Sequence, residues 1–224
     1  MKIVAVVGSP HGVRGNTGRL LTLVLEGAKG EGAKTKIISL TGGTLLPCRA
    51  CDGCHKRGRC SRKDEFEPLK QEIMAADGLV LASPNYIRNV SAQLKAFMDR
   101  CCGVVHCLGF EGRYGASVVT SGGGEDEFVA ETMNHFLMTT GVRSVGSVWT
   151  VMGQIGDEGF PEEISARATA LGRNLVSSWK NRTINPEAEK EMAAFRERMR
   201  ALIAYHKDEW PYEYKYWREH HGLT

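Results

Sequence analysis

Residues 1–18 read MKIVAVVGSPHGVRGNTG, and this segment sets the architecture expected for the whole chain. The β-branched run around Val4 and Val6 is typical of a parallel strand that is covered on both faces. Asn16 or Thr17 is expected to cap the helix that follows. Because the free N–H groups and the dipole at a helix N-terminus suit a phosphate group, the sequence predicts an anion site at this turn.

The sequence of this turn indicates which kind of phosphate-binding site it fits. No Lys-Ser/Thr pair follows its glycines, and the strand does not run into G-x-G-x-x-G, so neither a triphosphate P-loop nor a dinucleotide site is indicated. A monophosphate fits better, with an ordinary polar turn as the alternative. The side chains that could donate to one phosphate are Ser9, Arg14, Asn16 and Thr17.

Length and charge narrow the class of protein. The 224 residues, 42% of them hydrophobic, suit one α/β domain with extensions. The formal charge of +3 comes from 29 basic and 26 acidic residues that are intermixed, so neither a nucleic-acid nor a membrane partner is indicated. No stretch approaches the roughly 20 apolar residues of a membrane span, and no signal-like segment precedes the first strand. We therefore expect a cytoplasmic protein.

Strand-like and helix-like segments alternate five times, which predicts a doubly wound parallel sheet with helices on both faces. The first strand lies within residues 1–7, and the later ones are expected at 34–40, 79–82, 115–119 and 142–152. Five strands favour the order 2-1-3-4-5. We expect one domain over residues 1–180, with a cysteine-rich loop at 41–62. A C-terminal helix and an aromatic tail are expected over 181–224.

In that strand order, the loops after strands one, three and four meet at the carboxyl edge of the sheet. These loops, 9–18, 83–91 and 120–126, are rich in glycine, hydroxyl and amide groups, so one ligand touching all three is the economical interpretation. A flavin mononucleotide (FMN) fits, with its phosphate in the first loop and its ring between the other two. Pro84, Asn85 and Tyr86 would border the ring, and residues 122–124 would let backbone approach it. Tyr86 as a rim aromatic and the glycines as a mobile turn are the alternatives.

A compact cysteine motif lies in the loop expected at 41–62. Its members are Cys48, Cys51, Cys54 and Cys60. Three cysteines at successive third positions with a fourth nearby favour a [4Fe-4S] cluster over zinc, and cysteines without a metal or paired as a disulfide remain alternatives. The loop follows strand two, so it is expected to leave the sheet at the same edge as the flavin loops.

Other candidate ligands surround this motif. His55 could substitute as a ligand, although a solvated loop histidine is the more common case. Cys101, Cys102 and Cys107 lie on or just after an expected helix at 92–105 and are interpreted as small buried hydrophobic residues.

Several of these segments together resemble the NADPH-dependent FMN reductase-like flavoproteins, and within them the iron–sulfur flavoproteins of anaerobes. The segments are the G-S-P turn followed by Gly15-Asn16-Thr17, the four-cysteine loop, Ser83-Pro84-Asn85-Tyr86, and LKAFMDR at 94–100. The resemblance covers about residues 1–180. It implies a flavodoxin-like fold, one FMN per subunit, a [4Fe-4S] cluster on the four cysteines, and a homodimer or homotetramer.

The resemblance also implies a set of site residues. Members of the family often have an arginine directly after G-S-P, where this chain has His11 and a loop that is one residue longer. The residues expected to bind FMN are Ser9, His11, Arg14, Asn16, Thr17, Gly18, Pro84, Asn85, Tyr86, Ile87, Ser121, Gly122 and Gly123.

The expected activity is an oxidoreductase that passes electrons through FMN, and no catalytic side chain is named because the cofactor supplies the chemistry. A non-catalytic electron carrier or flavin redox sensor is one alternative, and an NAD(P)H:FMN or quinone reductase without a cluster is another. The chain has no obvious nicotinamide-nucleotide motif, so ferredoxin, NAD(P)H and quinone all stay open as redox partners. The aromatic tail is expected to be buried against the domain or against a neighbouring subunit, and rings left exposed on a monomer would be covered in a dimer or tetramer.

Overall fold

The sheet has the topology that the sequence predicts. The computed structural model describes residues 1–155 and 159–224. Its five strands pair in parallel in the order β2-β1-β3-β4-β5. They are β1 (Lys2–Val7), β2 (Lys34–Ser39), β3 (Gly78–Pro84), β4 (Tyr114–Ser121) and β5 (Arg143–Val151). The central strands β3 and β4 are buried along their whole length, as expected of strands covered on both faces.

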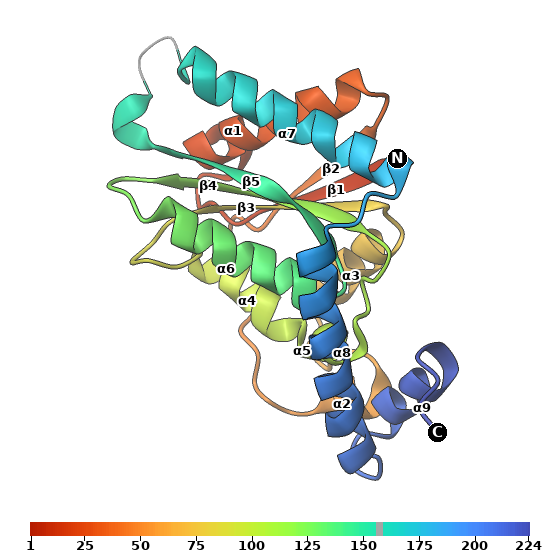
Figure 1. Cartoon of the computed structure of the whole chain (residues 1–224). Coiled ribbons are helices and arrows are strands. Elements are labelled where there is room, and N and C mark those ends of the chain that lie inside the picture. The colour runs from red at the N-terminus through yellow and green to blue at the C-terminus, as the bar shows by residue number, and fades with distance from the viewer. Residues whose placement is uncertain (156–158) are drawn as a thin grey trace.

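Helices cover both faces of the sheet (Figure 1). One face carries α1 (Asn16–Gly30) and α7 (Glu162–Asn181), whose apolar sides form one core with the strands. The other face carries α3 (Phe66–Met74), α4 (Ala92–Arg100) and α6 (Asp126–Thr139), which form a second core. Helix α5 (Cys102–Cys107) continues from α4 after a break at Cys101, so the single helix expected at 92–105 is two helices.

Two glycines let α1 and α7 pack closely. A Cβ atom on Gly27 would lie 2.0 Å from the carbonyl oxygen of Thr169, and one on Gly172 would lie 1.8 Å from that of Val24. Side chains cannot occupy such gaps, because non-bonded atoms at that separation overlap. The contact lies in the C-terminal half of α1 and fixes this helix against α7.

One of the two predicted N-caps, that of α4, is present, and the one predicted for α1 is not. Ser91 caps α4 as expected, and its Oγ accepts a hydrogen bond from the Leu94 amide at 3.3 Å. Neither Asn16 nor Thr17 caps α1. The N-cap is Gly15, in extended backbone, and among the described side chains none accepts a hydrogen bond there. The expected cap was wrong because the helix begins one residue earlier, at Asn16 itself.

The C-terminal region forms a third core below the sheet (Figure 1). It contains α8 (Pro186–Tyr205) and α9 (Pro211–His220). Trp217 is fully buried there, and its Nε1 donates to the carbonyl of His106 at 2.9 Å. The tail thus buries this ring against its own chain, whereas Tyr212 stays exposed. The tail does not support the expected homodimer or homotetramer, which stays a prediction.

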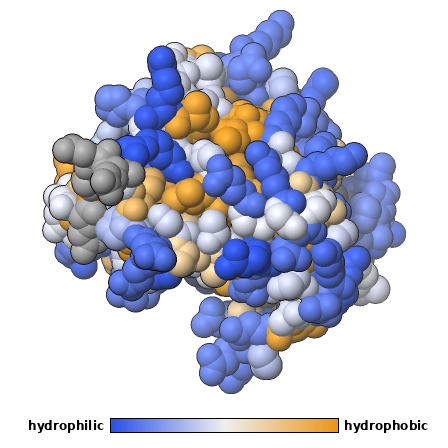
Figure 2. Space-filling view, turned by 90° about the horizontal axis from the view of Figure 1, so that it is seen from above, coloured by the Kyte–Doolittle hydropathy of each residue, from blue (hydrophilic) through white to orange (hydrophobic). Residues whose placement is uncertain are grey.

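The remaining elements are short. Helix α2 (Gly53–Arg57) lies within the cysteine-rich loop, and two 3-10 turns cover Gly12–Arg14 and Met152–Gln154. Within the described residues, no helix is both long enough and apolar enough to cross a membrane. Viewed from the side of α1 and α7, hydrophilic side chains cover most of the surface around an apolar patch (Figure 2).

Candidate functional site

A hollow of about 370 Å³, here called the edge pocket, opens where β1, β3 and β4 end. All three expected loops contribute to it. It is lined by Ser9, His11, Gly15, Asn16, Thr17, Pro84, Asn85, Tyr86, Thr120, Ser121, Gly122 and Met152. Most of the residues expected to bind FMN are therefore brought together. Met152 was not expected, because it follows β5, whereas the strand order predicts a site only from the loops after strands one, three and four.

Four of the expected residues do not line the edge pocket. Arg14 is exposed at the end of the first 3-10 turn. Ile87 is fully exposed, with φ at +50°. Gly123 has open space around its Cβ position, and Gly18 instead packs closely on the backbone of Val13. Sequence spacing placed these residues in the right loops, but it could not show which side of each loop faces the hollow.

Hydrogen bonds tie the three loops to one another. Thr17 Oγ1 and Thr120 Oγ1 lie 2.7 Å apart, which joins the start of α1 to the end of β4. The Asn85 amide donates to the carbonyl of Thr120 at 2.8 Å. The Asn85 side chain donates through Nδ2 to the carbonyl of Gly124 at 2.9 Å. Such contacts position the walls of the pocket before a ligand enters.

Two features of the pocket point to a ligand. The start of α1 presents amide N–H groups that no described side chain caps, which is the arrangement that favours an anion. Asn85 Oδ1 is buried and has no hydrogen-bond partner among the described residues. A buried acceptor without a partner costs about 1–3 kcal/mol, so a donor on a ligand would relieve it. Tyr86 is 46% exposed, which is the rim position of the alternative interpretation.

The four motif cysteines are all free thiols. Cys48 and Cys51 are exposed, whereas Cys54 and Cys60 are half-buried. Hydrogen bonds from Ser61, the Gly53 backbone and Arg49 lower the pKa of Cys51 to about 7. The surroundings of Cys51 thus favour its thiolate, the form that ligates metals.

The motif does not lie beside the edge pocket. Cys54 and Cys60 line a separate hollow of about 110 Å³, here called the cysteine pocket, which shares no described residue with the edge pocket. The loop leaves β2 at the expected edge and then runs below α4 and α5 to α2 (Figure 1). Arg100, the last residue of α4, holds it there by an ion pair with Asp64 and by donating to the carbonyl of Leu46 at 3.2 Å.

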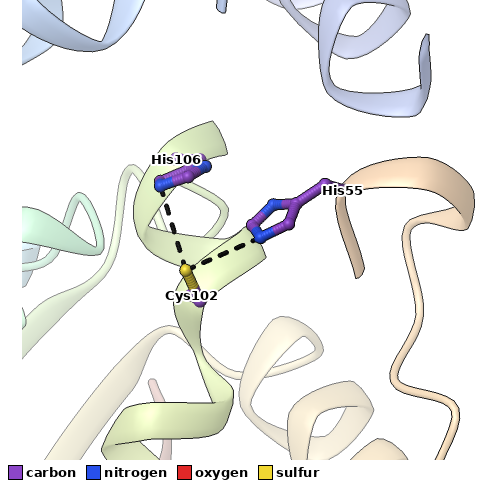
Figure 3. A group of neighbouring side chains, drawn as sticks. All are labelled: His55, Cys102 and His106. Carbon is purple, nitrogen blue, oxygen red and sulfur yellow. Dashed lines mark hydrogen bonds between the residues drawn. The ribbon is translucent and has the colours of Figure 1, made fainter. Parts of the chain in front are cut away.

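A third set of polar side chains was not anticipated. His55 on α2 and Cys102 and His106 on α5 place one ligand atom each within 4.8 Å of the others (Figure 3). We call this set the His-Cys-His group. Among the described residues, no other three potential metal ligands lie this close together. The four motif thiols are therefore not gathered around a common point.

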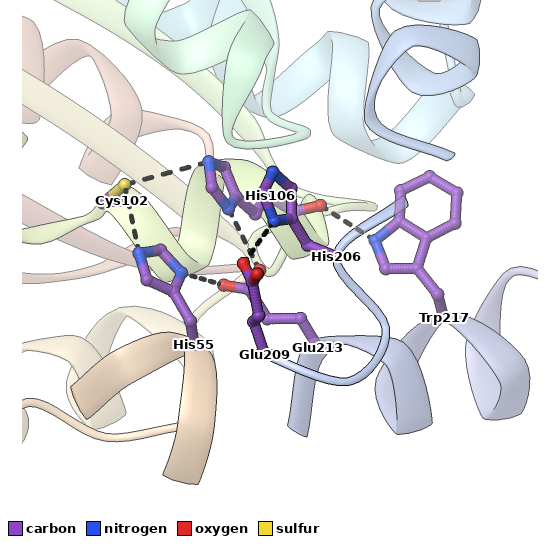
Figure 4. Close-up of polar contacts among 7 residues, drawn as sticks. All are labelled: His55, Cys102, His106, His206, Glu209, Glu213 and Trp217. Carbon is purple, nitrogen blue, oxygen red and sulfur yellow. Dashed lines mark hydrogen bonds and ion pairs between the residues drawn. The ribbon is translucent and has the colours of Figure 1, made fainter. Parts of the chain in front are cut away.

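Glu213 of α9 joins the two histidines of this group (Figure 4). Its Oε1 lies 2.6 Å from His55 Nδ1 and its Oε2 lies 3.0 Å from His106 Nδ1. Glu213 is fully buried, and the Trp210 ring stacks on His55 with the centroids 4.8 Å apart. The group is therefore enclosed by the tail rather than open to solvent.

Burial and hydrogen bonds shift the pKa values of this group in opposite directions. Burial alone lowers the pKa of His55, but hydrogen bonds led by those with Cys102 and Cys54 raise it to about 12. Hydrogen bonds with His106 and His55 lower the pKa of Cys102 to about 6. Burial alone would also lower the pKa of His106, but its hydrogen bonds with Cys102 and Glu213 raise it to about 9.

Two sequence interpretations are corrected here. His55 is buried rather than solvated, because α9 covers it, and Cys102 contacts two imidazoles rather than serving only as a small hydrophobic residue. Cys101 and Cys107 are buried as expected. The Cys102-x-x-x-His106 spacing on one helix face was an available signal. Nothing in the sequence indicated that Glu213 would reach both histidines.

The sheet order, the flanking helices and a polar hollow at the strand-order switch point define a flavodoxin-like α/β protein. The profile of the NADPH-dependent FMN reductase family matches residues 1–157, more than half of the chain. The chain belongs to this family.

Similar proteins of known sequence or structure are consistent with that assignment. An iron-sulfur flavoprotein of Archaeoglobus fulgidus is 29% identical over 223 residues, which cover 98% of this chain and 98% of that protein. A solved flavone reductase has a TM-score of 0.65 at 17% identity over 80% of this chain, and the match spans 63% of the reductase, less than two thirds of it. A flavodoxin from the domain Archaea has a TM-score of 0.53 at 14% identity, covering 80% of this chain and 99% of the flavodoxin. The two structures support the fold.

Proposed function

We propose that this protein is an iron–sulfur flavoprotein that binds FMN in the edge pocket and transfers electrons between a reduced donor and an acceptor. The observation that carries the FMN site is the convergence of three loops around the uncapped start of α1. The family match and the name of the full-length Archaeoglobus relative support it. FMN would supply the electron-transfer chemistry, and the chain would supply binding and orientation.

Different parts of the edge pocket would hold different parts of FMN. The amides at the start of α1, with the side chains of Ser9, Asn16 and Thr17, would hold the phosphate. Asn85 Oδ1, which has no hydrogen-bond partner among the described residues, would accept one from the flavin ring. Tyr86 would cover the ring at the rim.

Flavin analysis of the purified full-length chain tests the FMN site. We expect released flavin to be FMN, and we expect colourless protein to bind added FMN more tightly than riboflavin, because riboflavin lacks the phosphate. Thr17→Val should weaken FMN binding and leave riboflavin binding nearly unchanged. Thr22→Val is the matched control, since Thr22 lies on the same helix and bonds only to the carbonyl of Gly18. Equal affinity for the two flavins, or no flavin binding, contradicts the proposal.

We also propose that Cys48, Cys51, Cys54 and Cys60 hold a [4Fe-4S] cluster. The donor set fits, because four free thiols lie in one loop and Arg100 Nη2 donates to the Cys60 sulfur at 3.2 Å. The exposed Cys48 and Cys51 would have to turn toward the half-buried Cys54 and Cys60 to complete it. Cluster and flavin would then lie in two separate pockets.

Anaerobic purification with iron and sulfide analysis tests the cluster. We expect about four irons and four sulfides per chain, lost in Cys51→Ala while FMN stays bound. Cys101→Ala is the control, because Cys101 is buried outside the motif. Zinc at the motif, or no iron under strict anaerobiosis, would leave an FMN reductase without a cluster. Steady turnover of NADH or NADPH with a quinone would favour the enzyme, and reduction only by reduced ferredoxin would favour an electron carrier.

A further inference from the structure

The ligand atoms of the His-Cys-His group are arranged around a common point. Cys102 Sγ lies 3.8 Å from His55 Nε2 and 3.8 Å from His106 Nε2 (Figure 3). A tetrahedral zinc ion, with Zn–S of about 2.3 Å and Zn–N of about 2.0 Å, holds its ligand atoms roughly 3.3–3.6 Å apart. Small side-chain rotations would therefore bring the three atoms to one ion. His106 lies one helical turn after Cys102, so α5 alone supplies two of the ligands.

Glu213 orients both imidazoles for such an ion. Each of its oxygens faces the Nδ1 of one histidine, at 2.6 Å and 3.0 Å, so each Nδ1–H can donate to the carboxylate (Figure 4). A metal ion that binds Nε2, the atom that faces Cys102, would displace its proton and leave the imidazole neutral, with Nδ1–H still donating to Glu213. Histidines that bind metals usually donate their other N–H to a carboxylate or carbonyl in this way. Glu213 is fully buried and contacts both histidines, so it is not an ordinary solvated surface carboxylate.

We propose that His55, Cys102 and His106 bind one divalent transition-metal ion of the zinc type. Imidazole and thiolate are the ligands that zinc takes, and three protein ligands leave a fourth position for water. The site uses none of the four motif cysteines, so it stands apart from the proposed cluster and from FMN.

The ion would join two segments that are far apart in sequence, and Glu213 would connect a third segment to them through the two histidines. His55 belongs to the cysteine-rich loop, Cys102 and His106 to the helix below the sheet, and Glu213 to the tail. Because an ion that binds only the folded arrangement stabilises it, metal binding would hold the tail and the loop on α5.

The test removes the competing thiols first. In full-length protein carrying Cys48→Ser and Cys51→Ser, the motif keeps only two thiols. After incubation with one equivalent of zinc and desalting, we expect about one zinc per chain, and X-ray absorption should report one sulfur and two or more nitrogen or oxygen ligands. No retained zinc, or two or more sulfur ligands, would overturn the proposal. This measurement does not depend on whether FMN or a cluster is bound.

Variants in the same background give an independent readout of zinc affinity by competition with a chelator. Cys102→Ser should abolish retention, and Glu213→Gln should weaken binding about 10–100-fold, as expected for loss of the group that orients the histidines. His206→Gln is the matched control, since His206 stacks on Trp210 and pairs with Glu209 outside the ligand set. An equal loss in all three variants would mean that only the fold of the tail is being measured, and it would refute the site.

Discussion

The edge pocket and the His-Cys-His group are both polar sites, but their residues come together by different routes. The edge pocket is made from loops that the strand order alone brings to one edge of the sheet. The His-Cys-His group needs α2, α5 and α9, which sheet topology does not place. A site that topology builds can be anticipated from sequence, whereas a site that side-chain packing builds cannot. The comparison also predicts that the two sites can be disturbed separately.

Trp217→Ala should have the largest effect and should separate the two sites. Removing this fully buried ring from the third core is expected to cost about 3–5 kcal/mol of unfolding free energy in that region. The carbonyl of His106 also loses its indole donor. Urea unfolding followed by tail fluorescence should shift to lower urea, while FMN affinity at zero urea stays within about twofold of wild type.

Tyr205→Ala is the control for that substitution, because Tyr205 is 84% exposed on the same C-terminal region and should have little effect. A large drop in FMN affinity in folded Trp217→Ala protein would show that the edge pocket depends on the tail, and the separation of the two sites would be wrong.

Asp64→Asn tests what keeps the cysteine loop away from the edge pocket. Burial alone would raise the pKa of Asp64, but hydrogen bonds from Arg100 and the Leu46 amide hold it at about 2. Arg100 is buried, so removing its partner is expected to cost about 3 kcal/mol. Chemical unfolding at pH 7 should show this loss. Asp99→Asn, which breaks an exposed pair with Lys95, should cost less than about 1 kcal/mol.

The same pair predicts an acid dependence of stability. Because the folded-state pKa of Asp64 lies below the unfolded value of about 3.9, its contribution is complete above about pH 5 and is lost as the pH falls toward 2. Wild-type stability should therefore fall more steeply than that of Asp64→Asn between pH 5 and pH 2. Parallel curves for the two proteins would contradict the ion pair.

Asn85→Ala addresses the edge pocket itself. It removes the unpaired Oδ1 acceptor and the donor to the carbonyl of Gly124. One hydrogen bond to FMN is worth about 0.5–1.5 kcal/mol, so the dissociation constant should rise about 3–10-fold. Asn89→Ala, in the same loop but outside the pocket lining, is the control. An unchanged FMN affinity in Asn85→Ala would show that Oδ1 does not face the ligand.

The sequence predicts the features that local patterns determine, and it does not predict those that depend on tertiary packing. Alternation of strands and helices, with β-branched runs such as that around Val4, was enough for the strand order and for the loops of the edge pocket. The side of a loop that faces inward was not predictable, as Ile87 shows: the sequence placed it at the FMN site, but its side chain is fully exposed and its φ is +50°. The contact of Glu213 with His55 spans 158 residues and depends on how α9 packs, for which no sequence period exists.

Tyr86→Phe should have the smallest effect, and it sharpens the description of the edge pocket. Tyr86 lines the pocket but is 46% exposed, so its hydroxyl is expected to remain in water while the ring covers the flavin. Removing only the hydroxyl should change FMN affinity by less than about twofold, which is the typical size of a surface substitution. Tyr86→Ala removes the ring as well and should weaken binding by about 0.5–1.5 kcal/mol if ring stacks on ring. Fluorescence titration with FMN measures both. A loss in Tyr86→Phe as large as that in Tyr86→Ala would mean that the hydroxyl bonds directly to the flavin, and the rim assignment would be wrong.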